Sequence, residues 1–522
     1  MQTILAPSPR QAAILAALPL PRHLLIQACA GSGKTTTLGL IAATIPQNLR
    51  SVALCFNKAI ADEFTRKLPH HVEAKTLHSL GFAAVRAAVR NVRVDDRKLR
   101  NVIDSLPSLR TCAETVRRTL AGDLAVLVGL VSDMMVDPTD KEAVADAVAS
   151  TGRTVEMLNE ACEHLPGLLA QMDGMRGVIT FSEMIRHPLV HGYALPQFDV
   201  VLVDEAQDLN ASQHALVARI VKPGGKLIAV GDRAQSIYGF RGADRGSMDR
   251  LKSDWDMVEL PLDVSFRCPR AVVAEAQTIV GDGIQPSPSA PEGEVIRRDA
   301  KALGQTEAEL APGDMVLCRI NAPLVPLAFR LIRRGCRALI RGRDLGAGLL
   351  ALVRRLKAAD VGDLIAKARK WADKAIRQAE AADKGAATVQ AIEDKVDTLC
   401  AFAAESESVA DLMGRIEAIF ADVSPEGCVL LSTVHKAKGL EAERVVILRP
   451  DLLPAPWAKS EADQAQEKNI AYVAITRAKR TLIFQAAPEE KRGGKGRGKG
   501  KRNALDRALA PDDDADAAPV AV

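Results

Sequence analysis

The stretch Leu24-Leu-Ile-Gln-Ala-Cys-Ala-Gly-Ser-Gly-Lys-Thr-Thr36 decides the fold of this 522-residue chain. Its apolar start predicts a short buried strand, a loop of small residues follows, and Lys34 begins a predicted helix. Gly31 and Gly33 allow backbone N–H groups to approach an anion at the helix N-terminus. The pattern therefore predicts a phosphate-binding loop, with Ala28 where such loops usually carry their first glycine.

The residue types in this loop favour a nucleoside triphosphate bound with a divalent cation. Lys34 would reach the β- and γ-phosphates, and the Thr35 hydroxyl would be a ligand of Mg²⁺. The expected nucleotide contacts extend along the whole loop, over Ala28, Cys29, Ala30, Gly31, Ser32, Gly33, Lys34, Thr35 and Thr36. Such a loop indicates nucleotide use and little else, so residues elsewhere must decide the function.

Composition excludes several classes of protein. No apolar run approaches the roughly 20 residues of a membrane-spanning helix, and the N-terminus lacks a signal pattern, so no membrane association is expected. The nine cysteines are scattered without a C-x-x-C pair, which favours reduced thiols in the cytoplasm over a zinc or disulfide framework. The formal net charge of +4 does not by itself indicate nucleic acid, so any DNA affinity would have to come from local grooves.

Apolar runs and helical spacing divide the chain into two α/β units, and a further segment interrupts each of them. Near-continuous apolar runs at 199–203 and 227–230 predict parallel strands beside the phosphate loop. Two stretches with apolar residues at helical spacing interrupt the α/β texture and predict helical insertions. The expected order is a first lobe over 1–88 and 196–257 with its insertion at 89–195, a second lobe over 258–345 and 426–488 with its insertion at 346–425, and a tail at 489–522. The tail's basic and acidic runs predict a disordered charged segment, with a DNA-contacting arm as the alternative.

A second acidic motif, Asp204-Glu-Ala-Gln-Asp208, follows the apolar strand at 199–203. There Asp204 can be a ligand of Mg²⁺, and Glu205 can activate water against the γ-phosphate. The motif lies some 170 positions after the phosphate loop, and the first insertion explains this distance. Both motifs are therefore expected at strand ends of one parallel sheet.

These motifs and the other ordered segments resemble the UvrD/Rep/PcrA-like superfamily 1 DNA helicases nearly from end to end. The further matching segments are Pro7–Gln11, Val52–Phe64, Thr76–Ser79, Val230–Ala243, Ser265–Pro269, Thr433–Glu441 and Ala471–Ala478. The resemblance implies two RecA-like P-loop domains with parallel sheets, each carrying a mostly helical insertion. In its short second insertion and its Phe56-Asn-Lys58 sequence, the chain is more similar to the compact phage-type and F-box-helicase-like branches of this family than to the repair enzyme itself.

The resemblance also implies roles for residues around the nucleotide. It implies Gln11 at adenine, Phe266 stacked on adenine, Glu441 at the ribose, Gln235 at the γ-phosphate, and Arg267 and Arg477 as arginine fingers from the second lobe. Lys34, Glu205, Gln235, Arg267 and Arg477 form the implied catalytic set, and Thr35 and Asp204 the implied Mg²⁺ ligands.

On the DNA side, the resemblance implies aromatic pockets for bases and polar contacts around them. Stacking on an aromatic ring contributes about 1–3 kcal/mol per base and tolerates any sequence. The implied stacking residues are Phe56, Tyr238 and Phe240, and the implied contacts to backbone and bases are Asn57, Thr76, His78, Arg241 and His435.

The sequence is thus interpreted as that of an ATP-dependent, Mg²⁺-requiring helicase acting on single-stranded and duplex DNA in replication, recombination or repair. The family implies 3′→5′ movement; a monomer in the cytoplasm of a bacterial or phage-infected cell is expected, with replication or recombination proteins as partners. Two alternatives stay open: a translocase that strips proteins from single strands without unwinding, and a nucleotide-gated DNA-binding subunit. The residues do not exclude RNA as the substrate.

Overall fold

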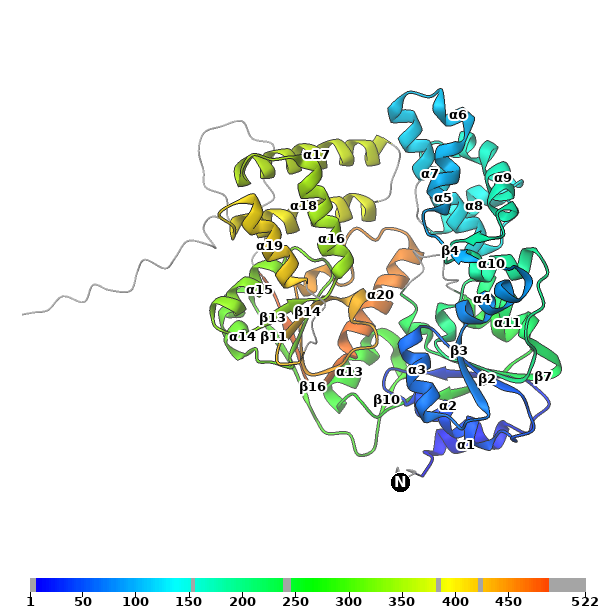
Figure 1. The fold of residues 1–522 in the computed structure, drawn as a ribbon. Helices are drawn as coiled ribbons and strands as arrows, with labels where there is room; N and C mark the ends of the chain where they lie inside the picture. Colours follow the sequence, from blue (N-terminus) through cyan, green and yellow to red (C-terminus); the bar gives the residue numbers. More distant parts are fainter. Residues whose placement is uncertain (1–5, 152–154, 238–245, 382–385, 421–425, 488–522) are drawn as a thin grey trace, which may run out of the picture.

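The computed structural model describes residues 6–151, 155–237, 246–381, 386–420 and 426–487. Two α/β lobes lie side by side, and each carries a group of helices on the same side of the molecule (Figure 1). The predicted tail at 489–522 lies outside the described residues.

The first lobe is built on a six-stranded sheet in which every pair of neighbouring strands is parallel. Its strands, in spatial order, are β3 (Val72–Thr76), β2 (Ser51–Cys55), β6 (Phe198–Val203), β7 (Val221–Gly231), β1 (Leu24–Ala28) and β8 (Val258–Leu262). β1, β2 and β6 are almost wholly buried, as strands covered on both faces must be. The predicted start of the second lobe at residue 258 is wrong by one strand, because β8 pairs with β1.

Helices cover both faces of this sheet. They are α1 (Pro9–Ala17), α2 (Lys34–Thr44), α3 (Lys58–Lys67), α4 (Leu77–Ala88), α10 (Glu183–Val190), α11 (Ala211–Ile220) and α12 (Ser247–Asp254). One core joins Leu38 and Ile41 of α2 to the sheet, and the other joins Leu216 and Val217 of α11 to it. Burial of these apolar side chains is the main favourable term that holds the lobe together.

The first insertion is helical, as its spacing predicts. It contains α5 (Lys98–Ser105), α6 (Pro107–Arg110), α7 (Glu114–Met134), α8 (Lys141–Thr151) and α9 (Leu158–Gly174), which share a core of their own. The short parallel strands β4 (Arg93–Val94) and β5 (Val178–Ile179) pair at its base. α10 follows β5 and packs against α4 and α11 of the first lobe, so it joins the insertion to the sheet.

The second lobe repeats the parallel architecture. Its strands, in spatial order, are β11 (Glu294–Arg298), β16 (Ala478–Gln485), β15 (Ala442–Leu448), β12 (Met315–Cys318), β14 (Val429–Thr433) and β13 (Ala338–Ile340). The helices packed around it include α13 (Arg270–Val280), α15 (Leu324–Arg333) and α20 (Glu461–Ile475). The predicted fold class, two α/β lobes with parallel sheets, is confirmed.

The second insertion consists of α16 (Arg343–Leu356), α17 (Val361–Ala381), α18 (Ala386–Ala404) and α19 (Val409–Ile419). Its predicted apolar stripes are buried, including Leu364, Leu399, Phe402 and Ile416. These side chains share one core with α15 of the second lobe. Within the described parts of the chain, no helix combines the length and the apolar character needed to cross a membrane.

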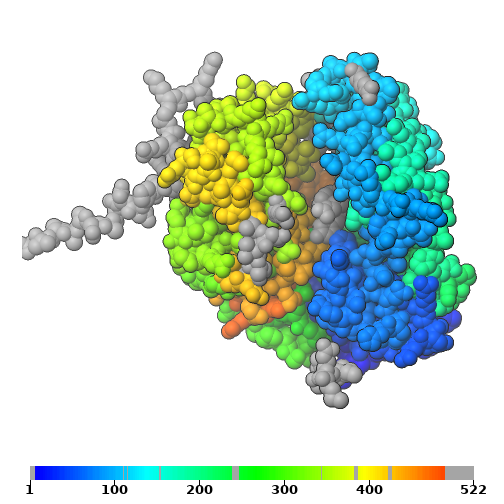
Figure 2. Space-filling view, in the orientation of Figure 1, coloured from blue at the N-terminus to red at the C-terminus, as the bar shows by residue number. Residues whose placement is uncertain are grey.

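The two lobes meet below the insertions, and a hollow separates the insertions in the space-filling view (Figure 2). α20 lies at the meeting point, between the second sheet and the first lobe (Figure 1). The Tyr472 hydroxyl on α20 accepts a hydrogen bond from the Ala30 N–H, at 3.0 Å. The Asn469 side chain donates to the carbonyls of Arg233 and Ser236.

Candidate functional site between the lobes

The phosphate-binding loop has the predicted conformation. β1 ends at Ala28, α2 begins at Lys34, and Gly31 and Gly33 have φ values of +74° and +81°. These left-handed conformations suit glycine because it lacks a Cβ. The loop leads directly into the N-terminus of α2, where backbone N–H groups and the helix dipole favour an anion.

Lys34 is paired with the predicted water-activating carboxylate. Its Nζ lies 2.7 Å from the Glu205 Oε1, and both side chains are largely buried. Burial opposes the charge on Glu205, but Lys34, followed by Lys438, outweighs burial and holds the pKa of Glu205 well below its usual range. The Gln207 side chain donates a further hydrogen bond to Glu205. The carboxylate is therefore ionised, as a group that orients water must be.

Asp204 has the surroundings expected of a cation ligand. It is buried directly after β6, and it accepts only the Glu205 N–H, at 3.0 Å, among the hydrogen bonds of the described residues. Burial, and then the neighbouring charge of Glu205, raises the pKa of Asp204. A bound divalent cation would relieve this excess of negative charge, and oxygen ligands suit Mg²⁺. Asp204 and the partly buried Thr35 hydroxyl of the loop therefore fit the predicted Mg²⁺ site.

Two arginines of the second lobe lie at the same place. The backbone N–H of Phe266 donates to the Gly31 carbonyl, at 2.9 Å. A Cβ built on Gly31 would lie 2.4 Å from the Arg267 Cβ, so the arginine segment lies directly against the phosphate loop. Arg477 is fully buried, and its guanidinium donates to the Val473 and Leu440 carbonyls and to the Thr476 hydroxyl.

Arg477 has no carboxylate partner in the part of the chain that the structure describes. Burial, and then the charge of Arg267, lowers the pKa of Arg477 to about 10, so the side chain stays cationic at neutral pH. Burying a cation without an anionic partner costs free energy, which a bound anion would offset. The structure thus brings the predicted Lys34, Glu205, Arg267 and Arg477 close to one another at the phosphate loop.

Glu441 and Gln235 make contacts that the sequence did not predict. Glu441 forms ion pairs with Arg267, at 2.5 Å, and with Lys479, at 2.6 Å. The Gln235 side chain donates to the buried Asp232 carboxylate, at 2.6 Å. Their predicted contacts with ribose and γ-phosphate stay predictions, and both would require these side chains to exchange partners.

The predicted adenine residues lie at the edge of the phosphate loop. The Gln11 amide is buried next to the loop and donates to the Thr37 hydroxyl of α2, at 3.1 Å. Phe266 exposes 54% of its surface beside Gly31. An exposed ring here is suited to stack on a flat base.

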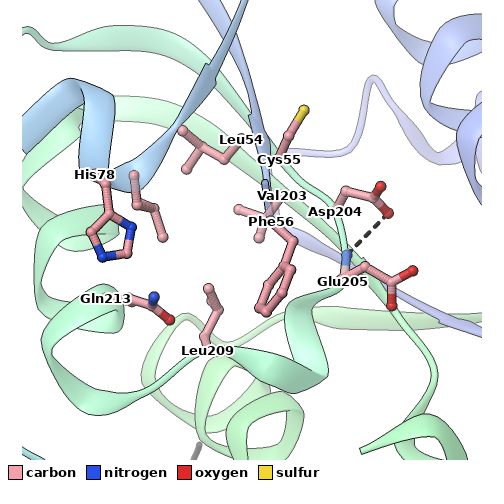
Figure 3. Close-up of a pocket in the computed structure, with 10 residues that line it drawn as sticks. Leu54, Cys55, Phe56, His78, Val203, Asp204, Glu205, Leu209 and Gln213 are labelled. Atoms are coloured by element: carbon pink, nitrogen blue, oxygen red, sulfur yellow. Dashed lines mark hydrogen bonds between the residues drawn. The ribbon is translucent and has the colours of Figure 1, made fainter. Parts of the chain in front are cut away.

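The first-lobe segments that are predicted to contact DNA line a pocket next to the carboxylates of Asp204 and Glu205. Figure 3 shows Phe56 between His78 and the Asp204–Glu205 pair, with Gln213 across the opening. Phe56 exposes 46% of its surface. The His78 ring stacks on Phe181 at 4.1 Å, and burial lowers its pKa to about 4. His78 is therefore neutral, and any contact with DNA would be through stacking or a hydrogen bond.

Asn57 and Thr76 have structural roles beside this pocket. The Asn57 side chain caps α3 by accepting the Ile60 N–H, and Thr76 caps α4 by accepting the Ser79 N–H. Such caps stabilise a helix by about 0.5–2 kcal/mol. The predicted DNA contacts of both residues stay predictions, and each side chain already serves its helix.

The remaining predicted DNA residues are separated from this pocket or not described. Tyr238, Phe240 and Arg241 lie outside the described residues. His435 lines a separate cavity of about 210 Å³ in the second lobe, together with Trp457 and Arg319. Trp457 was not predicted as a site residue, because its only signal in the sequence was its position between two motifs.

Comparison with known proteins identifies the family. A model described as the UvrD/REP helicase N-terminal domain matches residues 8–256, and one described as the UvrD-like helicase C-terminal domain matches residues 379–489. The matches follow in the family order and together cover well over half of the chain. The chain belongs to the UvrD/REP helicase family. The resemblance inferred from the sequence motifs is confirmed.

Relatives within the UvrD/REP family are about 25% identical to this chain over the aligned residues. F-box DNA helicase protein 1 of Schizosaccharomyces pombe is 24% identical over 507 residues, which cover 88% of this chain and 55% of that protein. UvrD1 of Mycobacterium leprae, an ATP-dependent DNA helicase, is 25% identical over 311 residues, or 53% of this chain and 39% of that protein. PcrA of Leuconostoc citreum, also an ATP-dependent DNA helicase, is 25% identical over 284 residues, or 49% and 37%. The chain thus spans about half the length of these relatives, or less.

One contact between the lobes at this site was not predicted from the sequence. Lys438 of the second lobe donates to the Asp208 carboxylate, at 2.6 Å, and to the Gln235 carbonyl, at 2.7 Å. Lys438 lies within the quoted Thr433–Glu441 segment, but the pattern did not show which residue it meets. It ties the second lobe to two phosphate-side motifs of the first.

Phe56→Ala tests the prediction that the exposed Phe56 ring stacks on a base. We expect Phe56→Ala to weaken binding of a single-stranded oligonucleotide by about 5- to 150-fold, the equivalent of about 1–3 kcal/mol of stacking. Fluorescence anisotropy with a labelled oligothymidylate measures the affinity. Ile332→Ala is the matched control, because Ile332 is a similarly exposed apolar residue on α15 of the second lobe. Equal losses in both variants would remove Phe56 from the DNA site.

Proposed function

We propose that this UvrD/REP family member is an ATP-dependent, Mg²⁺-requiring DNA helicase that moves 3′→5′ on single strands and unwinds duplex DNA. The observation that carries the proposal is that residues of both lobes converge on one phosphate loop. Lys34 and Glu205 come from the first lobe, and Arg267 and Arg477 come from the second. The cytoplasmic location, the monomeric state and the protein partners stay predictions.

Each of these side chains has a chemical task in phosphoryl transfer. Lys34 would bind the β- and γ-phosphates, and Mg²⁺ at Asp204 and Thr35 would neutralise charge on the same oxygens. Glu205 would orient the attacking water, because it is ionised and lies beside Lys34. Arg267 and Arg477 would stabilise the charge that develops in the transition state. Since they belong to the second lobe, hydrolysis would require the lobes to be closed.

The sheet supplies a short path from this chemistry to DNA. Leu54 of β2 pairs with Val203 of β6, so Phe56 and Glu205 leave the same sheet edge on neighbouring strands. The contacts between the lobes, from Tyr472 to Ala30 and from Lys438 to Asp208, join the second lobe to the loop and to the acidic motif. Closing and opening of the cleft would therefore alter the grip of the two lobes on a strand and move it.

Strand displacement on tailed duplexes tests the proposal. We expect unwinding of a duplex with a 3′ single-stranded tail and none of one with a 5′ tail, with ATP and Mg²⁺ present. Release of a fluorescently labelled strand measures unwinding, and Glu205→Gln is the inactive control. Unwinding from 5′ tails alone, or unwinding that persists in Glu205→Gln, would contradict the proposal.

A second candidate follows from the short second insertion, which contains only the helices α16 to α19 in the described residues. A translocase without unwinding activity would hydrolyse ATP on single strands and displace a bound protein, but leave both tailed duplexes paired. Displacement of streptavidin from a biotinylated strand end, measured beside unwinding, separates the two activities. A nucleotide-gated binding subunit would show neither activity, and its nucleotide turnover would be unaffected by Lys34→Ala.

A further inference from the structure

A dense cluster of polar side chains lies at the joint between the first insertion and the first lobe, away from the phosphate loop. Asp173 near the end of α9 contacts Arg186 and His187 of α10 there. Among the described residues, six of the eleven buried side-chain polar atoms that lack a hydrogen-bond partner belong to this joint. They are Asp173 Oδ1, Arg186 Nε, His187 Nδ1 and Nε2, His191 Nε2 and Tyr193 Oη. Buried polar atoms are normally paired, so this concentration calls for a ligand.

Three residues of the cluster have the geometry of a metal site. One ligand atom each from Asp173, His187 and His191 all lie within 4.8 Å of one another. His187 is fully buried, and its Nε2 lies 3.3 Å from Glu183 Oε1 and 3.7 Å from Asp173 Oδ1. Among the described residues, neither ring nitrogen makes a well-directed hydrogen bond. His187 and His191 are four residues apart at the end of α10, which places both rings on one face, and their centroids are 4.9 Å apart.

The surrounding charges leave this set of donors available. The Arg186 guanidinium donates to Asp173 Oδ2, at 2.7 Å, which orients the carboxylate and leaves Oδ1 facing the histidines. Lys98 is buried and neutralised by Glu183, at 2.8 Å, with a second bond to the Met172 carbonyl. Each cation is thus paired with its own carboxylate. A carboxylate ligand held by an arginine is the outer-shell arrangement that metal sites use.

Two members of the cluster, Asp173 and His191, are only partly buried. The Asp173 side chain is 15% exposed, so a small ion can reach the cluster from solvent without unfolding of the joint.

We propose that Asp173, His187 and His191 form a site for a transition-metal dication of the zinc class. Two imidazoles and one carboxylate suit zinc, and they leave a fourth tetrahedral position for water. Magnesium and calcium prefer all-oxygen sites. The ion would tie α9 of the insertion to α10 of the first lobe, and so stiffen the joint on which the insertion stands. This inference is independent of the proposed helicase activity.

Zinc titration of the full chain tests the site. The metal-stripped protein is titrated with Zn²⁺ in excess Mg²⁺, against a chromophoric chelator of known affinity. We expect one such Zn²⁺ site per chain, and both His191→Gln and Asp173→Asn should weaken it by at least the roughly 10–100-fold cost of losing even an outer-shell partner. His70→Gln, at an exposed histidine of the first lobe, should bind zinc as the wild type does. Binding by all variants alike, or no binding by the wild type, would overturn the proposal.

Cobalt substitution identifies the ligands without any variant. Co²⁺ bound to imidazole and carboxylate should show visible d–d bands and no thiolate-to-cobalt charge transfer. A charge-transfer band would place the metal at cysteine instead and would also overturn the proposal.

Zinc should raise the melting temperature of the wild type, because a ligand that binds only the native state stabilises it. It should leave the melting temperature of a folded His191→Gln variant unchanged. An equal rise in both would contradict the assignment.

Discussion

Replacing Arg267 with alanine will lower the DNA-stimulated turnover of ATP by about 10³–10⁵-fold, the range of arginine fingers in phosphoryl transfer. The reason is its position: the Arg267 backbone lies against Gly31 of the phosphate loop, and among the described residues its guanidinium forms an ion pair with Glu441 alone. The side chain is 22% exposed, so its loss should not unfold the lobe. A coupled assay of phosphate release at saturating ATP and single-stranded DNA measures the effect.

The matched control for Arg267 is Arg297→Ala, elsewhere in the second lobe. Arg297 forms an exposed ion pair with Glu275, at 2.7 Å, and such surface pairs contribute about 0–1 kcal/mol. Its removal should leave turnover unchanged. If Arg267→Ala retained more than about a tenth of wild-type turnover, Arg267 would be a cleft ion-pair residue and not a finger.

Replacing Glu205 with glutamine will lower ATP turnover by about 10²–10⁴-fold, the usual contribution of a positioned base. Glutamine keeps the shape of the side chain, but it carries no charge to hold Lys34 and cannot accept a proton from water. Nucleotide binding should persist, because Lys34 loses a competing anion and becomes freer to bind phosphate. Turnover is measured by phosphate release, and affinity by a fluorescent ATP analogue.

Glu73→Gln provides the control for Glu205, since Glu73 is exposed on the edge strand β3 and its ion pairs within the described parts of the chain are long, near 4 Å. It should turn over ATP as the wild type does. A Glu205→Gln variant that stayed within about tenfold of wild-type turnover would mean that another group orients the water. The neighbouring Asp208, buried and bound to Lys438, would then be the next group to examine.

The strands and the phosphate loop could be predicted because their signals are local. A run such as 199–203 is apolar at every position but one, as a strand covered on both faces must be, and it became β6. The lobe boundary was wrong because β8 has the mixed pattern Val-Glu-Leu-Pro-Leu. An edge strand is half exposed, and its membership of a sheet depends on a partner, β1, that lies over 200 residues away.

The candidate site was predicted in its membership and less well in its contacts. Family motifs named Glu441, Gln235, Asn57 and Thr76, but not that the first two would bind Arg267 and Asp232 or that the others would cap helices. A motif specifies which side chains are present. The partner that each one chooses depends on which groups come within about 3 Å of it.

By itself, the sequence determined the strand–loop–helix that is predicted to bind phosphate, the two α/β lobes and the family to which the chain belongs. These features follow from residues within a few positions of one another, where periodicity, glycine placement and helix starts act directly. Only the tertiary structure decided how the lobes meet: Tyr472 on Ala30, Lys438 on Asp208 and Arg267 against Gly31. Each pair joins the two lobes and is separated by 230 to 442 positions. Their meeting therefore depends on how whole lobes pack, which no local pattern encodes.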